Sequence, residues 1–261
     1  MASVVDLHGE TRGEGPDLVL LHPVGLDGTF WAPLAAAAAA THRVTALDLR
    51  GHGRSAMGDS RATIDDYVAD IHAAMARRCR GPAVVLGLSF GGMLAQLVTL
   101  HHPAAVAALV ACGCTGGFAP EVRPLLAERG LAAVRDGMAS VVPATIERWF
   151  TPAFRADPRV EAVRARLLAD DPASWSAAWH AISTFDALPR LAEVAVPALV
   201  IAGDADAATP IAAATRLAEA IPDAELRVLS GAPHMMQIEC SAAFNAAVVA
   251  FLREARTVAP R

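Results

Sequence analysis

Ser89 stands between two glycines in the segment GLSFG, directly after a short apolar run at residues 83–86 and directly before a stretch with helical character. A strand, a tight turn and a helix in this order can present a serine hydroxyl as a nucleophile. Small neighbours allow the backbone to turn sharply, and the helix N-terminus supplies partial positive charge where an oxyanion would form. We therefore predict that Ser89 attacks an electrophilic carbon such as an acyl carbonyl.

A serine hydroxyl is a weak nucleophile, so it needs a base, and the base needs an acid that orients it. The segment LRVLSGAPH places His234 in a loop between the last expected strand and the final helix. The segment ALVIAGDAD places Asp204 and Asp206 just after the preceding strand, and open α/β sheets carry their sites at such strand ends. We predict His234 as the base. Asp206 is favoured as the acid, because its spacing from Gly203 gives the chain room to turn, and Asp204 remains the alternative.

An oxyanion formed by this attack needs two backbone N–H donors. One is expected from Phe90, the residue after the nucleophile, and the other from the early loop LVLLHPVGLDGTFW. Pro23 has no N–H, so Val24 is the predicted second donor, with Gly25 in reserve. Trp31, at the end of the same loop, is predicted to contact the substrate.

Apolar runs alternate with helical stretches along most of the chain, which predicts an α/β fold with a mostly parallel central sheet flanked by helices. Continuous apolar runs suit strands that are covered on both faces. The expected strands are residues 4–8, 18–21, 44–47, 83–86, 107–111, 198–202 and 226–229, and the segment GETRGEGP after the first is expected to be a turn. The expected helices are residues 64–80, 90–102, 211–220 and 242–256.

One segment interrupts this alternation. Residues 117–189 contain helical stretches separated by prolines, no convincing strand, and three of the four tryptophans. We predict a helical lid at 117–189, inserted into a core formed by residues 1–116 and 190–261. Arg148 and Trp149, adjacent in this segment, are predicted to contact the substrate, since a guanidinium matches a carboxylate and an indole supplies an apolar wall.

The composition argues against several classes of function. The chain has 261 residues, a net charge of −5 and a pI near 6.0, which disfavours a nucleic-acid partner. An uncharged run at residues 81–120 is long enough for a membrane span, but glycines, a glutamine, two histidines and a proline interrupt it, so no membrane segment is expected. The start MASVVDLHGE has no cationic stretch followed by an apolar one, which favours the cytoplasm.

The motifs predict neither a metal nor an organic cofactor. The cysteines at positions 79, 112, 114 and 240 have no zinc-type spacing and are expected to be free thiols. The segment LDLRGHGRS contains a G-x-G, but Arg54 and Ser55 follow it, which favours a turn near the site over a nucleotide-binding loop. The oligomeric state is left open.

The motifs HPVG, LDLRGHGRS, GLSFGGMLAQ, LVIAGDAD and APHMMQIE, in this order, resemble the α/β-hydrolase superfamily across essentially the whole chain. Within it, the segments TIERWFTPAF, LLADDPASWSAAWHAI and FNAAVVAFL are similar to 3-oxoadipate enol-lactonases of aromatic-acid degradation. The chain departs from them at Phe90, where many relatives carry Met, and in the HPVG loop, where those lactonases are rich in Ser and Asn. The resemblance implies a Ser-Asp-His hydrolase that cleaves a small ester or lactone through an acyl-enzyme.

Other branches of the superfamily remain as alternatives. Dehalogenases and epoxide hydrolases of this fold use Asp where Ser89 stands, so they are disfavoured. Cofactor-free haloperoxidases or perhydrolases and carbon–carbon bond hydrolases share the Ser-Asp-His set. A ligand receptor built on a hydrolase fold can also retain it, and turnover with covalent labelling of the serine would separate an enzyme from a receptor.

Overall fold

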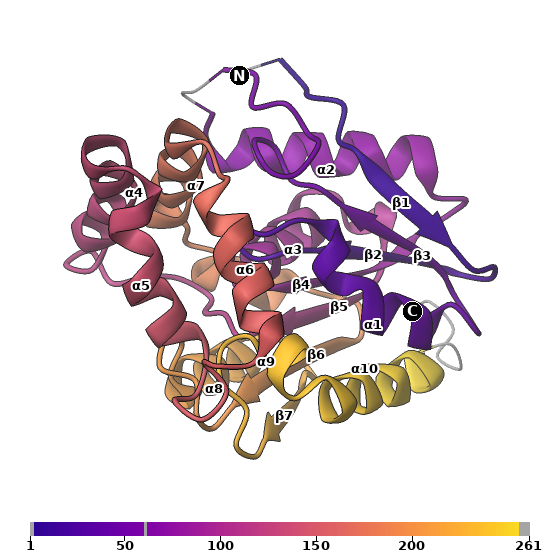
Figure 1. Cartoon of the computed structure of the whole chain (residues 1–261). Helices are drawn as coiled ribbons and strands as arrows, with labels where there is room; N and C mark the ends of the chain where they lie inside the picture. The colour runs from indigo at the N-terminus through magenta and orange to yellow at the C-terminus, as the bar shows by residue number, and fades with distance from the viewer. Residues whose placement is uncertain (1–2, 60–61, 256–261) are drawn as a thin grey trace.

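A computed structural model describes residues 3–59 and 62–255. Its core is a seven-stranded sheet in the order β1-β3-β2-β4-β5-β6-β7, parallel throughout except for the edge pair of β1 and β3 (Figure 1). The strands are β1 (Gly9–Arg12), β2 (Asp17–Leu21), β3 (Arg43–Leu47), β4 (Ala83–Leu88), β5 (Val106–Cys112), β6 (Ala198–Gly203) and β7 (Glu225–Leu229).

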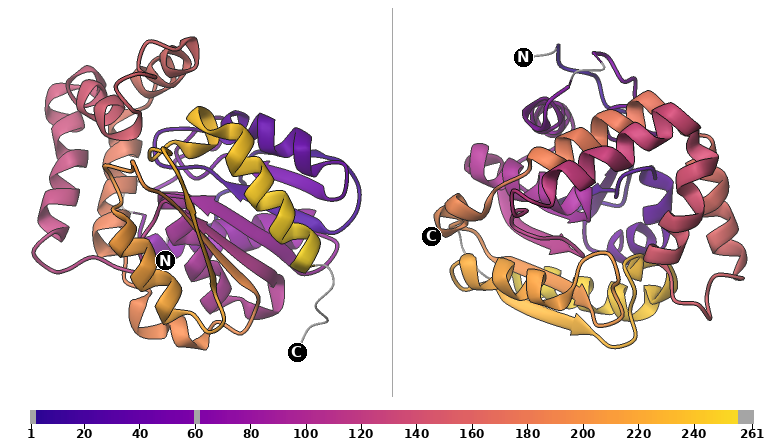
Figure 2. Two further views of the ribbon diagram at one scale, coloured as in Figure 1. Left: turned by 90° about the horizontal axis from the view of Figure 1, so that it is seen from below. Right: turned by 90° about the vertical axis from the view of Figure 1, so that its left-hand side faces the viewer.

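Helices cover both faces of this sheet. The α-helices are α1 (Ala32–Ala38), α2 (Ile64–Arg78), α3 (Phe90–His101), α4 (Arg123–Asp136), α5 (Met138–Trp149), α6 (Pro158–Leu168), α7 (Pro172–Thr184), α8 (Ile211–Ala220), α9 (Met236–Glu239) and α10 (Ser241–Ala255). Short 3₁₀ helices are η1 (Gly28–Trp31), η2 (Pro103–Ala105) and η3 (Leu188–Glu193). Helices α1 and α10 pack together on one face, and α2, α3 and α8 lie on the other (Figure 2).

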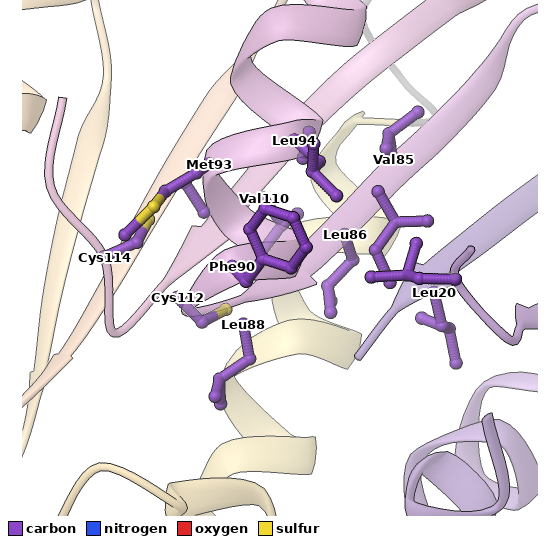
Figure 3. Close-up of a cluster of buried hydrophobic side chains, with 14 of the residues drawn as sticks. Leu20, Val85, Leu86, Leu88, Phe90, Met93, Leu94, Val110, Cys112 and Cys114 are labelled. Atoms are coloured by element: carbon purple, nitrogen blue, oxygen red, sulfur yellow. The ribbon is translucent and has the colours of Figure 1, made fainter. Parts of the chain in front are cut away.

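The central strands are apolar on both faces because helices cover both. Every residue of β2, β4 and β6 is buried. Helix α3 is almost as apolar, since it packs against the sheet on one side and α2 and η3 on the other. Figure 3 shows the ring of Phe90, the first residue of α3, directed into this core among side chains that include Leu86, Leu88 and Val110. The charge-free run at residues 81–120 is therefore core. Within the described part of the chain, no helix has the length and apolar character needed to cross a membrane.

The first predicted strand was wrong. Residues 4–8 are not a strand, and the edge strand is GETR, which the sequence suggested as a turn. Gly9–Arg12 pairs antiparallel with β3 at the edge of the sheet, where three of its four residues are exposed. An edge strand needs no apolar run, so hydrophobicity did not reveal it. The other six expected strands and the four expected helices lie within two residues of the observed bounds, and position 256 falls outside the described residues.

Helices α4 to α7 follow one another between β5 and β6 and gather as one group beside the sheet (Figure 2, left). A single antiparallel bridge between Gly117 and Asp186 joins the two chain segments that lead into and out of this group. We call α4–α7 with their connections the lid, and we retain residues 117–189 as its proposed extent. Helices α4 and α7 pack along each other and give the lid its own core, with Ala133 and Trp175 buried.

Candidate active site

Ser89 occupies a strained turn between β4 and α3. Its backbone angles are φ 54° and ψ −117°, a region that residues other than glycine rarely adopt. Its N–H donates to the carbonyl of Cys112 at 2.8 Å. A Cβ on Gly91 would lie 2.1 Å from the carbonyl oxygen of Leu21, so the chain can turn this tightly only with glycine there. Such strain concentrates at functional sites and presents the hydroxyl above the sheet.

His234 and Asp206 form a buried hydrogen-bonded pair. Nδ1 of His234 lies 2.9 Å from Oδ2 of Asp206, and the side chains are only 3% and 1% exposed. The other carboxylate oxygen, Oδ1, accepts from the backbone N–H groups of Ala208 and Thr209 at 2.7 and 2.8 Å. A carboxylate can only accept, so Nδ1 carries the proton and Nε2 is left unprotonated, as a general base requires.

Asp204 has a different partner. It is exposed, and its Oδ1 accepts from the backbone N–H of Gly231 at 2.5 Å. This contact joins the loop after β6 to the loop that leads to His234. The structure thus brings Asp206, and not Asp204, to the histidine.

A cavity of about 440 Å³ lies where the parallel strands end beneath the lid. The core contributes Val24, Ser89, Thr209 and His234, from the loops after β2, β4, β6 and β7. Ser89 and His234 therefore face one space, although no hydrogen bond joins their side chains within the described residues. In structures without substrate such contacts are commonly long and tighten only in the complex.

Two backbone N–H groups beside Ser89 have no acceptor among the described residues: those of Val24 and Phe90. His22 orients the first of them. The N–H of Leu49 donates to its Nε2 at 2.9 Å, so Nδ1 must carry the proton and donate to the carbonyl of Pro23 at 2.7 Å. The carbonyl and the N–H of a trans peptide point in opposite directions, so this bond fixes the direction of the Val24 N–H.

His22 keeps this role because it stays neutral. Its burial lowers its pKa to about 4, so the imidazole is neutral at neutral pH, with the proton on Nδ1, and Nε2 can accept from the N–H of Leu49. Sequence reasoning predicted Val24 and Phe90 as donors but missed His22. Its signal was its position immediately before Pro23 in HPVG.

Three arginines of the lid line the cavity: Arg129 and Arg135 on α4 and Arg148 on α5. Arg135 pairs with Glu128 and Asp136. No carboxylate among the described residues lies within ion-pair distance of Arg129 or Arg148.

The guanidinium of Arg129 lies over the ring of Trp179, 5.0 Å from its centroid. Burial, and then the nearby charge of Arg148, lowers the pKa of Arg129 to about 10, which leaves Arg129 cationic at neutral pH. Sequence reasoning identified Arg148 and missed Arg129.

Of the two predicted tryptophans, one lines the cavity. Trp149 is 5% exposed and its ring centroid lies 6.3 Å from that of His234. Trp31 is 1% exposed and stacks on Phe244 of α10, with ring centroids 6.1 Å apart. Trp31 does not line the cavity, because η1 turns its ring toward α10, so we assign it no contact with substrate.

The lid is hydrogen-bonded to the loop that carries His234. The N–H of Met235 donates to the carbonyl of Trp149 at 3.1 Å. Thr151 donates twice to Glu239, from its N–H at 3.1 Å and from its hydroxyl at 2.5 Å. The end of α5 and the His234 loop therefore form one connected unit.

The described residues contain no group of three or more His, Cys, Asp or Glu side chains arranged to hold a metal ion.

Residues 18–247 match a model of the alpha/beta hydrolase family, which covers the strands and loops that carry Ser89, Asp206 and His234. The chain belongs to this family.

Three relatives of this alpha/beta hydrolase align with nearly its whole length. A crystal structure of the enol-lactonase from Burkholderia xenovorans is 31% identical, with a TM-score of 0.90 over 95% of this chain and 97% of that one. The pimeloyl-[acyl-carrier protein] methyl ester esterase of Vibrio atlanticus is 30% identical over 95% of this chain and 98% of that protein. The 3-oxoadipate enol-lactonase 2 of Acinetobacter baylyi is 29% identical over 97% and 95%. The expected resemblance to enol-lactonases is confirmed.

Proposed function

We propose that this protein is a serine hydrolase that cleaves a lactone or carboxylic ester through an acyl-enzyme. One observation carries the proposal: Ser89, Val24 and His234, which Asp206 holds by a hydrogen bond, line a single cavity, and the backbone N–H groups of Val24 and of Phe90, the residue after Ser89, have no acceptor among the described residues. Nucleophile, base, orienting acid and oxyanion donors are the parts that acyl transfer needs.

In the first half of the reaction, Nε2 of His234 takes the proton of the Ser89 hydroxyl as its oxygen attacks the carbonyl carbon. The N–H groups of Val24 and Phe90 stabilise the resulting oxyanion, a contribution of about 3–4 kcal/mol for each donor. The imidazolium then gives its proton to the leaving oxygen, and the carbon–oxygen bond of the ester breaks. A serine–histidine hydrogen bond that is absent without substrate is expected to form in the complex.

In the second half, His234 deprotonates a water molecule that attacks the acyl-enzyme, and Ser89 recovers its proton. When the substrate is an enol lactone, the alcohol released from the ring is an enol. It tautomerises to a ketone, which makes ring opening effectively irreversible.

The positive charges of Arg129 and Arg148 in the lid favour an anionic substrate. These two arginines, which have no carboxylate partner among the described residues, bring two positive charges to a cavity that many apolar side chains line, and an anion buried there without a partner would be costly. A carboxylate on the substrate would accept hydrogen bonds from this pair, with the ring of Trp149 beside the reacting group. The Burkholderia xenovorans relative is named an enol-lactonase and the Acinetobacter baylyi relative a 3-oxoadipate enol-lactonase. An enol lactone that carries a carboxylate, of the kind formed in aromatic-acid degradation, fits this arrangement.

A second candidate is the methyl ester of a longer acyl chain, as named for the Vibrio atlanticus relative. The specific observation in its favour is that the cavity extends along α4 to Leu125, an apolar side chain that is 67% exposed. An acyl chain could leave the pocket along that route, whereas a compact lactone would not use it.

The test is hydrolysis of a substrate panel by the wild type and by Ser89→Ala. The panel contains a carboxylated enol lactone, neutral lactones, methyl esters of dicarboxylic acids of increasing length, and nitrophenyl esters. Labelling of Ser89 by a fluorophosphonate, located by mass spectrometry, is measured alongside. Preference for the enol lactone supports the first candidate, and preference for long methyl esters supports the second. Tight binding of a panel member without turnover would indicate a receptor instead.

A further inference from the structure

Arg166, near the end of α6 in the lid, lies between two carboxylates. Its Nε is 2.9 Å from Oδ2 of Asp27, and its Nη2 is 2.7 Å from Oδ1 of Asp170. Asp170 belongs to the lid, whereas Asp27 belongs to the core loop after β2. All three side chains are at least four-fifths buried, so a single guanidinium joins lid and core away from bulk water.

Asp27 ends the loop that contains Val24. The loop turns between these residues, with the N–H of Leu26 donating to the carbonyl of Pro23 at 3.3 Å. Both carboxylate oxygens of Asp27 are used: Oδ1 accepts from the N–H and hydroxyl of Thr29, and Oδ2 faces Arg166. The position of this end of the loop therefore depends on a contact with the lid.

The lid also packs directly on the middle of the loop. Gly25 has φ +77°, and a Cβ there would lie 2.5 Å from Leu167 and 2.6 Å from Trp175. Only a glycine leaves room for the lid to sit this close. With His22 holding the Pro23 carbonyl from the core side, the loop lies between two fixed surfaces.

Arg166 is one positive charge between two carboxylates. Two buried carboxylates share it, and burial raises the pKa of Asp170 to about 7 even though Arg166 opposes that rise. The geometry gives Asp27 no other cation at this distance within the described residues. Removal of Arg166 would leave Asp27 without this ion pair, so that the link between the loop and the lid would rest on the packing at Gly25.

We propose that Arg166 is a positioning residue for the oxyanion hole: through Asp27 it holds the loop so that the Val24 N–H points at the developing oxyanion. The inference rests on the proposed function. Misdirection of a donor weakens stabilisation of the tetrahedral state much more than binding of a ligand that lacks an oxyanion.

The experiment compares two inhibitors of one shape. An aryl trifluoromethyl ketone adds Ser89 to give a hemiketal oxyanion, whereas the matching trifluoromethyl carbinol fills the cavity without one. For Arg166→Gln we expect the inhibition constant of the ketone to rise about 10- to 100-fold, while that of the carbinol stays within about 2-fold. Arg166→Lys, which keeps a cation near Asp27, should recover part of the loss.

The control is Arg164→Gln, two residues earlier on α6, where the arginine pairs with the exposed Glu161 at 3.2 Å. It should leave both inhibition constants unchanged. Asp27→Asn retains an acceptor for Thr29 but weakens the ion pair, so it should shift the ketone in the same direction by a smaller factor. This variant keeps the test informative if Arg166→Gln does not fold.

The outcomes separate this inference from the proposed function. Equal losses for ketone and carbinol would mean that Arg166 holds the lid together without aiming the donor. If Arg166→Gln weakens binding of neither the ketone nor the carbinol, Arg166 has no role in the site. If the wild type forms no hemiketal by fluorine NMR and hydrolyses no ester, the proposed function fails and this inference with it. If the wild type does both and the two inhibitors respond alike in Arg166→Gln, only this inference fails.

Discussion

Nδ1 of His234 donates a hydrogen bond to Oδ2 of Asp206 at 2.9 Å, while two backbone N–H groups hold the other carboxylate oxygen. The orientation of the carboxylate is therefore fixed by the loop at 208–209 and not by the histidine alone. The same two N–H groups would also set the orientation of the side-chain amide in Asp206→Asn.

Asp206→Asn should lose about 10³- to 10⁴-fold in kcat. The N–H groups of Ala208 and Thr209 would hold the amide oxygen, which turns the NH₂ group toward His234. Nδ1 would then have to accept, Nε2 would carry the proton, and the base would be lost. Asp204→Asn should reduce kcat much less, since the exposed Asp204 carboxylate accepts from the N–H of Gly231 and does not contact His234. Steady-state kinetics of both variants measure this, and a larger loss for Asp204→Asn would contradict the assignment.

Ser89→Ala and Ser89→Gly should both lower hydrolysis by at least about 10³-fold, yet differ in stability. Alanine keeps the backbone strain of φ 54°, whereas glycine relieves it. Glycine also raises the conformational entropy of the unfolded chain, which offsets part of this gain in stability. We expect Ser89→Gly to unfold with a free energy about 1 kcal/mol higher than Ser89→Ala. Urea unfolding followed by circular dichroism gives the comparison. Activity near the wild-type level in either variant would exclude a serine mechanism.

Arg148→Ala should lower kcat/KM for an anionic lactone by about 1.5–3 kcal/mol and hardly change it for a neutral ester. Arg129→Ala should show the same selectivity, because the two guanidinium groups act on one anion. Arg135→Ala is the matched control: Arg135 also lines the cavity, but Glu128 and Asp136 pair with it at 2.9 Å. Equal losses on both substrates would indicate that the arginines hold the lid together.

Asp170→Asn should change stability with pH in a defined direction. The folded pKa of Asp170 is about 7, against an ordinary 3.8, because it is buried and lies near Asp27 and Asp171, with only Arg166 opposing. Between about pH 4 and 7 the folded protein keeps a proton on Asp170 that the unfolded chain has released. The free energy of unfolding of the wild type therefore falls as pH rises through this range, and that of the variant does not fall for this reason. The free energy of unfolding of the variant, relative to wild type, should rise by about 3 kcal/mol over that range. A difference that is constant with pH would contradict the raised pKa.

The residues that carry the proposed chemistry were predictable because local sequence determines where they lie. Ser89, Asp206 and His234 each directly follow or closely succeed a recognisable strand, and parallel strands end at the same edge of a sheet. Trp31 was assigned to substrate because it follows the oxyanion loop, but a partner more than 200 residues away, Phe244, decides where its ring packs. Nothing local specifies that contact.

The same reason explains the residues that sequence reasoning missed. Arg129 reaches the cavity because α4 packs between α5 and α7, and Arg166 meets Asp27 across the boundary between lid and core. Charged residues on a helix most often face solvent, so only the packing of the helices distinguishes these two from Arg164. The sequence alone could not have indicated them.

The lid is attached to the core at both sides of the cavity, by Arg166 to Asp27 and by Thr151 to Glu239. As a unit for engineering or for recombination between relatives, it is therefore larger than the inserted helices. A foreign lid grafted onto this core would meet an unmatched carboxylate at each side and would disturb the loops of Val24 and His234 together. A chimera that retains activity should have to exchange the loops at 22–29 and 230–240 along with the helices.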